Sequence, residues 1–276
     1  ETEVRILTKE DQEAGEIVAR ALRSDGVELL TSSEITRIEM ENGETVIHFE
    51  RNGTAERRTV DRVLIGVGRK PNVEGLNLEA VGVEYDSRRG VIVNDQLQTT
   101  NRTISAAGDV CSQDKFTHLA DFQARIVVRN ALFPLSRKAS SLTVPWCTYT
   151  SPEIAHVGMD EHEARQRGID VQTFVQKLSE VDRAVIDEAA EGFVKVHVKK
   201  GSDKILGATI VAEHAGDMIS EISTAMAAGM GLKRIAEVIH PYPTQAEAIR
   251  KLGDQYNRTR LTGPVQWLLR KWLAWR

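Results

Sequence analysis

Two Asn-Gly dipeptides, Asn42-Gly43 and Asn52-Gly53, constrain the fold of the N-terminal part of the chain more than any other feature. Each stands between runs of alternating apolar and polar residues, a setting in which Asn-Gly favours the tight turn of a β-hairpin. The pattern predicts an antiparallel meander with strands at residues 34–40, 45–50 and 54–60. An amphipathic helix is predicted before the meander, at residues 9–23, because apolar residues recur there at helical spacing.

The meander leads into residues 63–68, a run of apolar residues and glycine without alternation. Such a run is typical of a strand that is buried on both faces of a sheet. Further short strands are predicted at residues 91–93 and 104–107. A helix is predicted at residues 119–132, with Phe122, Ile126 and Val127 facing inward.

From residue 143 onward the pattern is one of strands grouped with separate helices. This grouping favours an α+β domain with an antiparallel sheet and helices on one face. The predicted strands lie at residues 143–148, 171–178, 192–199 and 204–212. The predicted helices lie at residues 160–167, 215–229, 232–238 and 244–253.

Composition excludes several classes of protein. Lys and Arg total 36 against 40 Asp and Glu, and this balance argues against a dedicated nucleic-acid binder. The two cysteines, Cys111 and Cys147, belong to no metal-binding motif, which disfavours a structural zinc site and a disulfide-rich secreted protein. We expect both to be unreactive thiols. No apolar run is long enough for a transmembrane helix. We expect a cytoplasmic protein, with membrane association as the alternative.

The first residue is Glu1 rather than an initiator Met, which is typical of a piece of a longer protein. Two segments further along contain glycines beside polar residues. In residues 66–72, the glycines could let a cofactor approach the backbone, or could simply form a tight turn. In Gly108-Asp109, the carboxylate follows a predicted strand, where α/β folds bind nucleotides, although a helix-capping or turn role is an equal alternative.

A third segment, residues 240–247, contains His240 and Tyr242 in a stretch that leads into a predicted helix and that two prolines make rigid. Thr244 and Glu247 have the spacing of a capping box, in which each side chain binds the backbone N–H of the other residue. The capping box accounts for Thr244 and Glu247 without catalysis. It leaves His240 and Tyr242 unexplained.

Four segments resemble, in their order, the successive signatures of class I pyridine nucleotide-disulfide oxidoreductases, the group of dihydrolipoamide dehydrogenase and mercuric reductase. They read GVGRKPN, ISAAGDV, VPWCTYTSPEIAHVGMDEHEA and HPYPTQAEAIRKLGD. The resemblance implies a mixed fold, in which α/β remnants of the NAD(P)- and FAD-binding domains precede an α+β interface domain with an antiparallel sheet. The implied domains are residues 1–70 (NAD(P)H), 71–138 (FAD), 139–256 (dimerisation) and a tail at 257–276.

The same resemblance implies that the cofactors are FAD and NAD(P)H. It assigns the Asp of the AxGD signature to the ribityl chain of FAD and places the following helix start near the isoalloxazine ring. Glu1 is a candidate for the acidic residue that holds the ribose, which would favour NAD over NADP. The residues that the resemblance connects with cofactor binding are Gly68, Arg69, Gly108, Asp109, His118, Leu119 and Ala120.

The candidate catalytic residues are Tyr242, Glu247 and His240. In the family's disulfide reductases, a His oriented by a Glu reaches across the dimer to the partner's disulfide. Here Tyr242 stands at the position of that His, and His240 lies two residues earlier. Because the pKa of tyrosine is near 10, it is a poor general base at neutral pH. The departure favours a mercuric-reductase-like protein, with a disulfide, a metal ion or another small molecule as substrate.

The family's glycine-rich flavin motif and its CxxxxC pair are not in this sequence. We therefore expect an inactive fragment of an FAD-dependent NAD(P)H oxidoreductase that does not retain FAD and forms a homodimer through residues 140–254. A dimerisation module without any cofactor is the alternative. The tail carries three tryptophans and basic residues, and residues 265–276 form either an amphipathic helix that contacts a membrane surface or an extra helix packed on the dimerisation domain.

Overall fold

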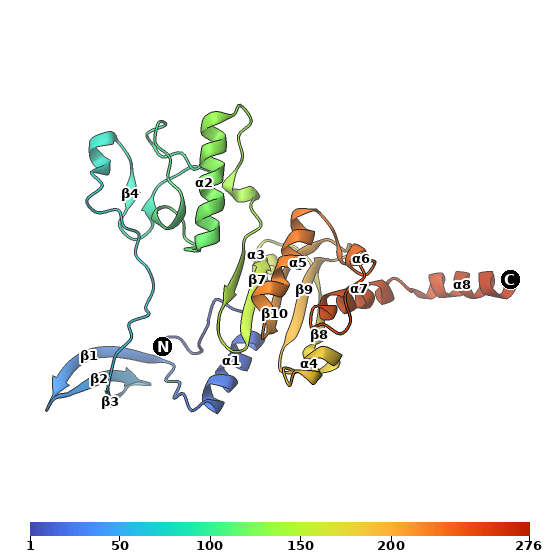
Figure 1. Cartoon of the computed structure of the whole chain (residues 1–276), viewed down its shortest axis with the longest axis horizontal. Helices are drawn as coiled ribbons and strands as arrows, with labels where there is room; N and C mark the ends of the chain where they lie inside the picture. Colours follow the sequence, from blue (N-terminus) through green and yellow to red (C-terminus); the bar gives the residue numbers. More distant parts are fainter. The chain divides into compact units, whose positions relative to one another are not determined.

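The computed structural model describes residues 1–276, which divide into two compact units. One unit consists of residues 1–62 together with 145–276, and the other consists of residues 63–144 (Figure 1). Both contain helices and strands, and every paired strand in the molecule is antiparallel. The predicted mixed fold with an antiparallel sheet is therefore confirmed.

The N-terminal helix and meander form as predicted. Helix α1 (Gln12–Ser24) begins after Asp11, whose carboxylate accepts the backbone N–H groups of two residues in the first turn. Strands β1 (Ser33–Glu41), β2 (Glu44–Arg51) and β3 (Thr54–Val60) then pair in sequence order. Both Asn-Gly turns have positive φ at both residues, which explains why Asn and Gly occupy them.

The larger unit is built on a five-stranded sheet in the order β6-β7-β10-β9-β8. Its strands are β6 (Pro145–Thr148), β7 (Glu153–Gly158), β8 (Val171–Lys177), β9 (Phe193–Lys199) and β10 (Ile205–Ala212). The sequence pattern did not predict β7. The four inner residues of this strand are all buried, so its sequence lacks the alternation by which a half-buried strand is recognised.

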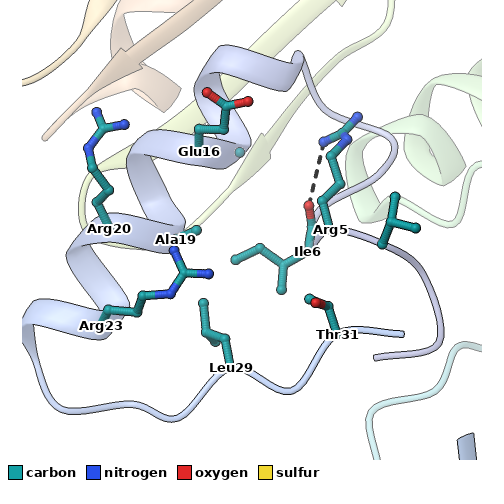
Figure 2. Close-up of a pocket in the computed structure, with 10 residues that line it drawn as sticks. Arg5, Ile6, Glu16, Ala19, Arg20, Arg23, Leu29 and Thr31 are labelled. Atoms are coloured by element: carbon teal, nitrogen blue, oxygen red, sulfur yellow. Dashed lines mark hydrogen bonds between the residues drawn. The ribbon is translucent and has the colours of Figure 1, made fainter. Parts of the chain in front are cut away.

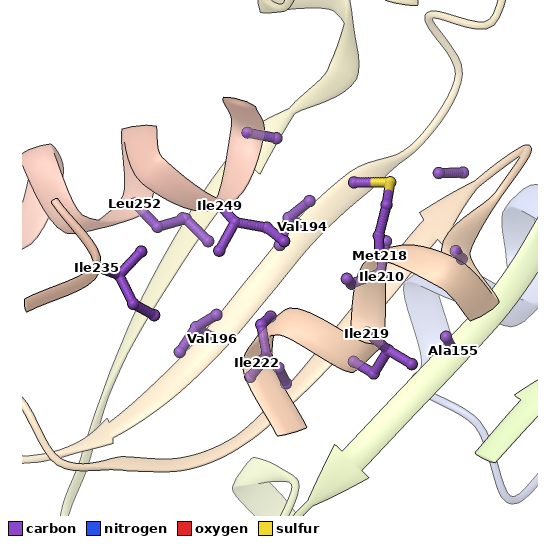
Figure 3. Close-up of a cluster of buried hydrophobic side chains, with 14 of the residues drawn as sticks. Ala155, Val194, Val196, Ile210, Met218, Ile219, Ile222, Ile235, Ile249 and Leu252 are labelled. Atoms are coloured by element: carbon purple, nitrogen blue, oxygen red, sulfur yellow. The ribbon is translucent and has the colours of Figure 1, made fainter. Parts of the chain in front are cut away.

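Helices cover both faces of this sheet. On one face, α5 (Ala215–Ala227), α6 (Leu232–Ile235) and α7 (Glu247–Thr259) enclose the main core (Figure 3). On the other, α1 packs against Ile154, Phe193 and Val211. The prediction that helices lie on one face only is therefore wrong, because β10 is buried at every residue and needs cover on both sides. Two short helices, α3 (Glu161–Gln166) and α4 (Asp182–Ile186), complete this part.

The unit at residues 63–144 has a much smaller core, centred on Val73, Val83 and Val91. Its regular elements are the strands β4 (Tyr85–Asp86) and β5 (Gly90–Val91), the 3₁₀ turns η1 (Leu78–Val81), η2 (Gly108–Val110) and η3 (Ala139–Ser141), and helix α2 (Thr117–Leu132). The strand predicted at 91–93 is only two residues long. Residues 104–107 form no strand, and only a single bridge joins Ser105 to Gln98.

Two predictions about burial are wrong in this unit. Residues 63–68 form no strand, and the side chains of Leu64 and Val67 are 97% and 90% exposed. An apolar run forms a buried strand only where other strands pair with it, and no strand of the chain does so. On α2, Ile126 is buried as predicted, but Phe122 is 52% exposed, because Leu119 and Gln123 share the inward face with Ile126.

The tail contains helix α8 (Gly263–Trp275), in which every residue is exposed. The predicted helix is therefore present. It is not packed on the dimerisation domain, which was one of the two roles predicted for it. No helix in the molecule combines the length and the apolar character needed to cross a bilayer.

Candidate functional site

The first candidate site is the turn that contains Gly108 and Asp109, in the unit at residues 63–144. The backbone N–H of Gly108 donates a 2.7 Å hydrogen bond to the buried side-chain oxygen of Gln123 on α2. Gly108 has a φ of +78°, and a Cβ atom added here would lie 2.9 Å from the Cβ of Ala120. The position therefore requires glycine, and the turn is held firmly against the first two turns of α2.

Asp109 caps no helix but lies in a turn, and a capping or turn role was the predicted alternative to nucleotide binding. Its residue lies in η2, and its carboxylate is half-exposed and 3.8 Å from the guanidinium of Arg69. Arg69 Nη1 is itself fixed by a 2.5 Å hydrogen bond to the carbonyl oxygen of Lys115, and Lys115 Nζ binds the carbonyl oxygens of Asp109 and Ser112. Arg69 thus lies beside the carboxylate while Lys115 holds the backbone of Asp109, and the half-exposed carboxylate keeps lone pairs that can accept hydrogen bonds from hydroxyl groups.

Helix α2 begins directly beside this turn. The helix has 16 residues, no side chain caps its N-terminus, and no acidic residue lies in its first turn. The positive end of the helix dipole is therefore not neutralised by the helix itself. Of the predicted residues here, Leu119 is buried, Ala120 contacts the Gly108 turn, and His118 is exposed with its ring stacked on Phe116 at 5.3 Å between centroids.

The structure thus brings together four of the seven predicted cofactor residues, Arg69, Gly108, Asp109 and Ala120. Gly68 immediately precedes Arg69, is exposed, and has a φ of +118°, so it forms the turn that leads into the arginine. An aspartate with an adjacent glycine, a fixed arginine and the start of a helix can bind a ligand that carries both hydroxyl groups and negative charge. These residues fit one wall of a flavin nucleotide site.

The second candidate site is the segment that precedes α7. The side chain of His240 is 5% exposed, and its Nε2 lies 2.8 Å from a carboxylate oxygen of Glu221 on α5. The hydroxyl of Tyr242, by contrast, is at the surface and donates a 2.8 Å hydrogen bond to Asp182 at the start of α4. That hydrogen bond raises the pKa of Tyr242 above its usual value, because the neighbouring carboxylate stabilises the protonated phenol.

The predicted capping box before α7 is wrong. The hydroxyl of Thr244 donates to the carbonyl oxygen of Pro241 at 2.8 Å, and the helix begins at Glu247 with no side-chain cap. Residues 244–246 form a turn of their own, which moves Thr244 out of capping position. Glu247 instead binds Arg250 at 2.8 Å and makes no hydrogen bond to Tyr242, although its charge lies near enough to add to the raised pKa of Tyr242.

Both cysteines are free, as expected for unreactive thiols. Burial raises the pKa of Cys111 to about 11 and that of Cys147 to about 12, so very little thiolate exists at neutral pH. In Cys147 the nearby carboxylate of Glu153 adds to the effect of burial. Neither cysteine is a candidate nucleophile.

Three residues that hold these two sites in place were not predicted from the sequence, namely Gln123, Asp182 and Glu221. Gln123 lies 15 positions from Gly108, and Asp182 lies 60 positions from Tyr242. Only the periodicity of α2 could have indicated that Gln123 faces inward, and no local signal connects Asp182 or Glu221 with their partners.

A pocket of about 250 Å³ lies between α1 and the chain on either side of it (Figure 2). Three arginines line it, but two of them are already used within the fold. Arg5 donates to backbone oxygens, including that of Leu7 at 2.8 Å, and Arg20 pairs with Glu191 at 2.8 Å. The pocket is therefore a weaker candidate for an anionic ligand than the Asp109 turn.

Comparison with known families matches almost the whole chain. Residues 1–130 match the pyridine nucleotide-disulphide oxidoreductase model, and residues 144–252 match the dimerisation domain of the same family. The chain belongs to the pyridine nucleotide-disulphide oxidoreductase family. The Asp109 turn lies within the first match and the Tyr242 segment within the second.

Individual relatives support the same assignment. A mercuric reductase from Staphylococcus aureus is 37% identical over 89% of this chain and 45% of its own length. A dihydrolipoyl dehydrogenase from Mycoplasma pneumoniae is 36% identical over 89% of this chain and 52% of its own length. Among solved structures, the HOCl-induced flavoprotein disulfide reductase RclA from Escherichia coli matches with a TM-score of 0.83 and 27% identity, over 92% of this chain and 58% of that one. The chain spans about half the length of the curated relatives that it matches.

Proposed function

We propose that this chain supplies the interface domain and one wall of the flavin site of an FAD-dependent NAD(P)H oxidoreductase. The observation that carries the proposal is the Asp109 turn, in which a solvent-accessible carboxylate lies 3.8 Å from Arg69 at the start of an uncapped helix. Bound FAD would accept reducing equivalents from NAD(P)H and pass them to the substrate.

The residues of this wall would have three separate tasks. Asp109 would accept hydrogen bonds from the hydroxyl groups of the ribityl chain. The N-terminus of α2, with His118, Leu119 and Ala120, would stabilise negative charge at the nearby edge of the cofactor ring. Gly108 would keep the turn close to α2, because any side chain there would collide with Ala120. Gly68 and Arg69 would close the site from the preceding segment.

At the second site, Tyr242 would contact the substrate through the lone pairs of its hydroxyl oxygen rather than act as a base, because its hydroxyl proton is donated to Asp182. The hydrogen bond to Asp182 keeps its phenol protonated at neutral pH. His240, held by Glu221, would fix the conformation of the segment, and Glu247 would anchor the start of α7 through Arg250. A hydroxyl oxygen without a general base beside it suits a metal ion as electron acceptor better than thiol–disulfide exchange, which is in keeping with the mercuric reductases among the relatives.

We also propose that the protein is a cytoplasmic homodimer, because residues 144–252 match a dimerisation domain and cyclic two-fold dimers are the commonest closed assembly. The chain alone would not retain FAD. Asp109 and α2 bind one side of the cofactor only, and the glycine-rich turn that binds the pyrophosphate in this family is not in the sequence.

Replacing Asp109 with Asn in a full-length protein that contains this chain would test the flavin site. We expect the dissociation constant for FAD, measured by flavin fluorescence, to rise about tenfold or more, because hydrogen bonds to a charged group contribute about 1.5–3 kcal/mol. Asp114→Asn is the matched control, since Asp114 is an exposed aspartate five positions further on. Equal FAD affinity in both variants would contradict the proposal and favour a dimerisation module without a cofactor.

A further inference from the structure

Helix α8 has an apolar surface that nothing in the chain covers. All of its residues are exposed, including Trp272 at 49%, Leu268 at 64% and Trp275 at 89%. A helix of 13 residues that packs against nothing is only marginally stable in water. The family match ends at residue 252, before this helix begins, so the family's dimerisation domain does not account for it.

Most of the apolar residues of α8 gather on one side. At about 100° per residue, one half of the helix carries Val265, Leu268, Leu269, Trp272, Leu273 and Trp275. The other side carries Gln266, Arg270 and Lys271, with Trp267 between the two charged residues. This division is that of an amphipathic helix.

The charge in this region has one sign only. Residues 255–276 contain five basic residues and no acidic residue. Two of the cations lie over indole rings, Lys271 at 4.2 Å from the centroid of Trp267 and Arg276 at 4.7 Å from that of Trp272. Tryptophan next to a cation is the combination that favours the headgroup region of a bilayer, where the ring and the charge each find a suitable environment.

We propose that α8 binds the surface of membranes that contain anionic phospholipids and lies in the plane of the interface. Its 13 residues extend over about 20 Å, less than the roughly 30 Å of the hydrocarbon core, so the helix can lie on a bilayer but cannot cross it. A second copy of the chain is a poorer partner, because α8 has no acidic residue to meet the basic residues of another α8. An anionic surface complements every charge on the helix.

The test is co-sedimentation of the full 276-residue chain with vesicles. We expect binding to vesicles of phosphatidylcholine mixed with phosphatidylglycerol, and little binding to phosphatidylcholine alone. The double variant Arg270→Glu, Lys271→Glu should weaken binding on the order of 100-fold, because each cation near an anionic surface contributes about a fivefold increase in partitioning and each reversal adds repulsion. The matched control is Arg88→Glu, Arg89→Glu, an exposed basic pair in the β4–β5 turn.

A second variant separates lipid binding from self-association. Trp272→Ser with Trp275→Ser removes the apolar anchor but keeps every charge, and we expect it to abolish sedimentation with mixed vesicles. Its melting temperature should stay unchanged, because α8 buries no residue in the folded chain. The proposal would be overturned if both variants still bound the mixed vesicles. It would also be overturned if the unmodified chain bound no vesicles and the tryptophan variant lost dimer mass by light scattering, because α8 would then mediate self-association.

Discussion

The five-stranded sheet and the unit at residues 63–144 differ in how far the chain covers its own apolar residues. Strand β10 is buried at all eight positions, with α5 on one face and α1 contributing on the other. In the smaller unit, the equally apolar residues 63–68 are exposed and form no strand. An apolar sequence therefore forms a core in one region and an exposed surface in the other. The difference is whether other strands and helices of the chain pack against it.

Core truncation provides the largest test of this comparison. Ile210 on β10 is completely buried, so Ile210→Ala should lower the free energy of unfolding by about 2–5 kcal/mol. Leu64→Ala removes a similar side chain that is 97% exposed and should change it by less than about 0.5 kcal/mol. Urea denaturation of both variants measures the contrast. Similar losses in the two variants would mean that residues 63–68 are buried after all.

The contact between α1 and the sheet is the next most sensitive feature. Lys195 on β9 binds the carboxylates of Asp11 at 2.9 Å and Glu13 at 3.0 Å. Burial would lower the pKa of Lys195, but the hydrogen bonds to these two carboxylates outweigh it and raise the pKa. Lys195→Met should therefore cost about 1–3 kcal/mol, since it leaves two acidic groups without their partner.

The pH dependence of this effect has a definite sign. Because the pKa of Lys195 is higher in the folded state, its stabilising contribution is complete below about pH 10.4 and is lost as pH rises through the folded value. The difference in unfolding free energy between the wild type and Lys195→Met should therefore be the same at pH 7 and pH 9. A difference that disappears by pH 9 would show that the lysine is not paired in the folded state.

His197 on the same strand should make the protein sensitive to acid. Burial, together with the positive charge of Lys195, lowers the pKa of His197 below its usual value. The unfolded chain then binds a proton more readily, so stability is complete above about pH 6.5 and falls below it by at most about 1.4 kcal/mol per pH unit. His197→Gln should flatten the plot of melting temperature against pH between 6.5 and 5. An unchanged slope would assign the acid sensitivity to other groups.

The smallest effect is expected at Glu247. The carboxylate binds Arg250 rather than a backbone N–H, so Glu247→Gln loses one i,i+3 ion pair and should cost about 0.5 kcal/mol. Thr244→Ala should cost equally little, because Thr244 caps no helix. A loss above about 1 kcal/mol for Thr244→Ala would show that the capping box forms in solution.

Sequence patterns predicted the elements whose signals are local. The two Asn-Gly hairpins, α1, and four of the five strands of the main sheet follow from turn chemistry and periodicity. Strand β7 and the open state of residues 63–68 could not be predicted, because burial on both faces depends on residues far away in the chain. For the same reason, the sequence could not predict the residues that hold the candidate sites in place, such as Asp182 beside Tyr242.

The most direct test of the account is hydrogen–deuterium exchange on the 276-residue chain, comparing residues 205–212 with residues 63–68. We expect the amides of β10 to exchange only through global unfolding, because its backbone pairs with β7 on one side and β9 on the other. The amides of residues 63–68 should exchange as fast as those of an unstructured peptide. Strong protection of residues 63–68 would contradict the claim that the chain covers the apolar residues of its five-stranded sheet but leaves those of residues 63–68 exposed.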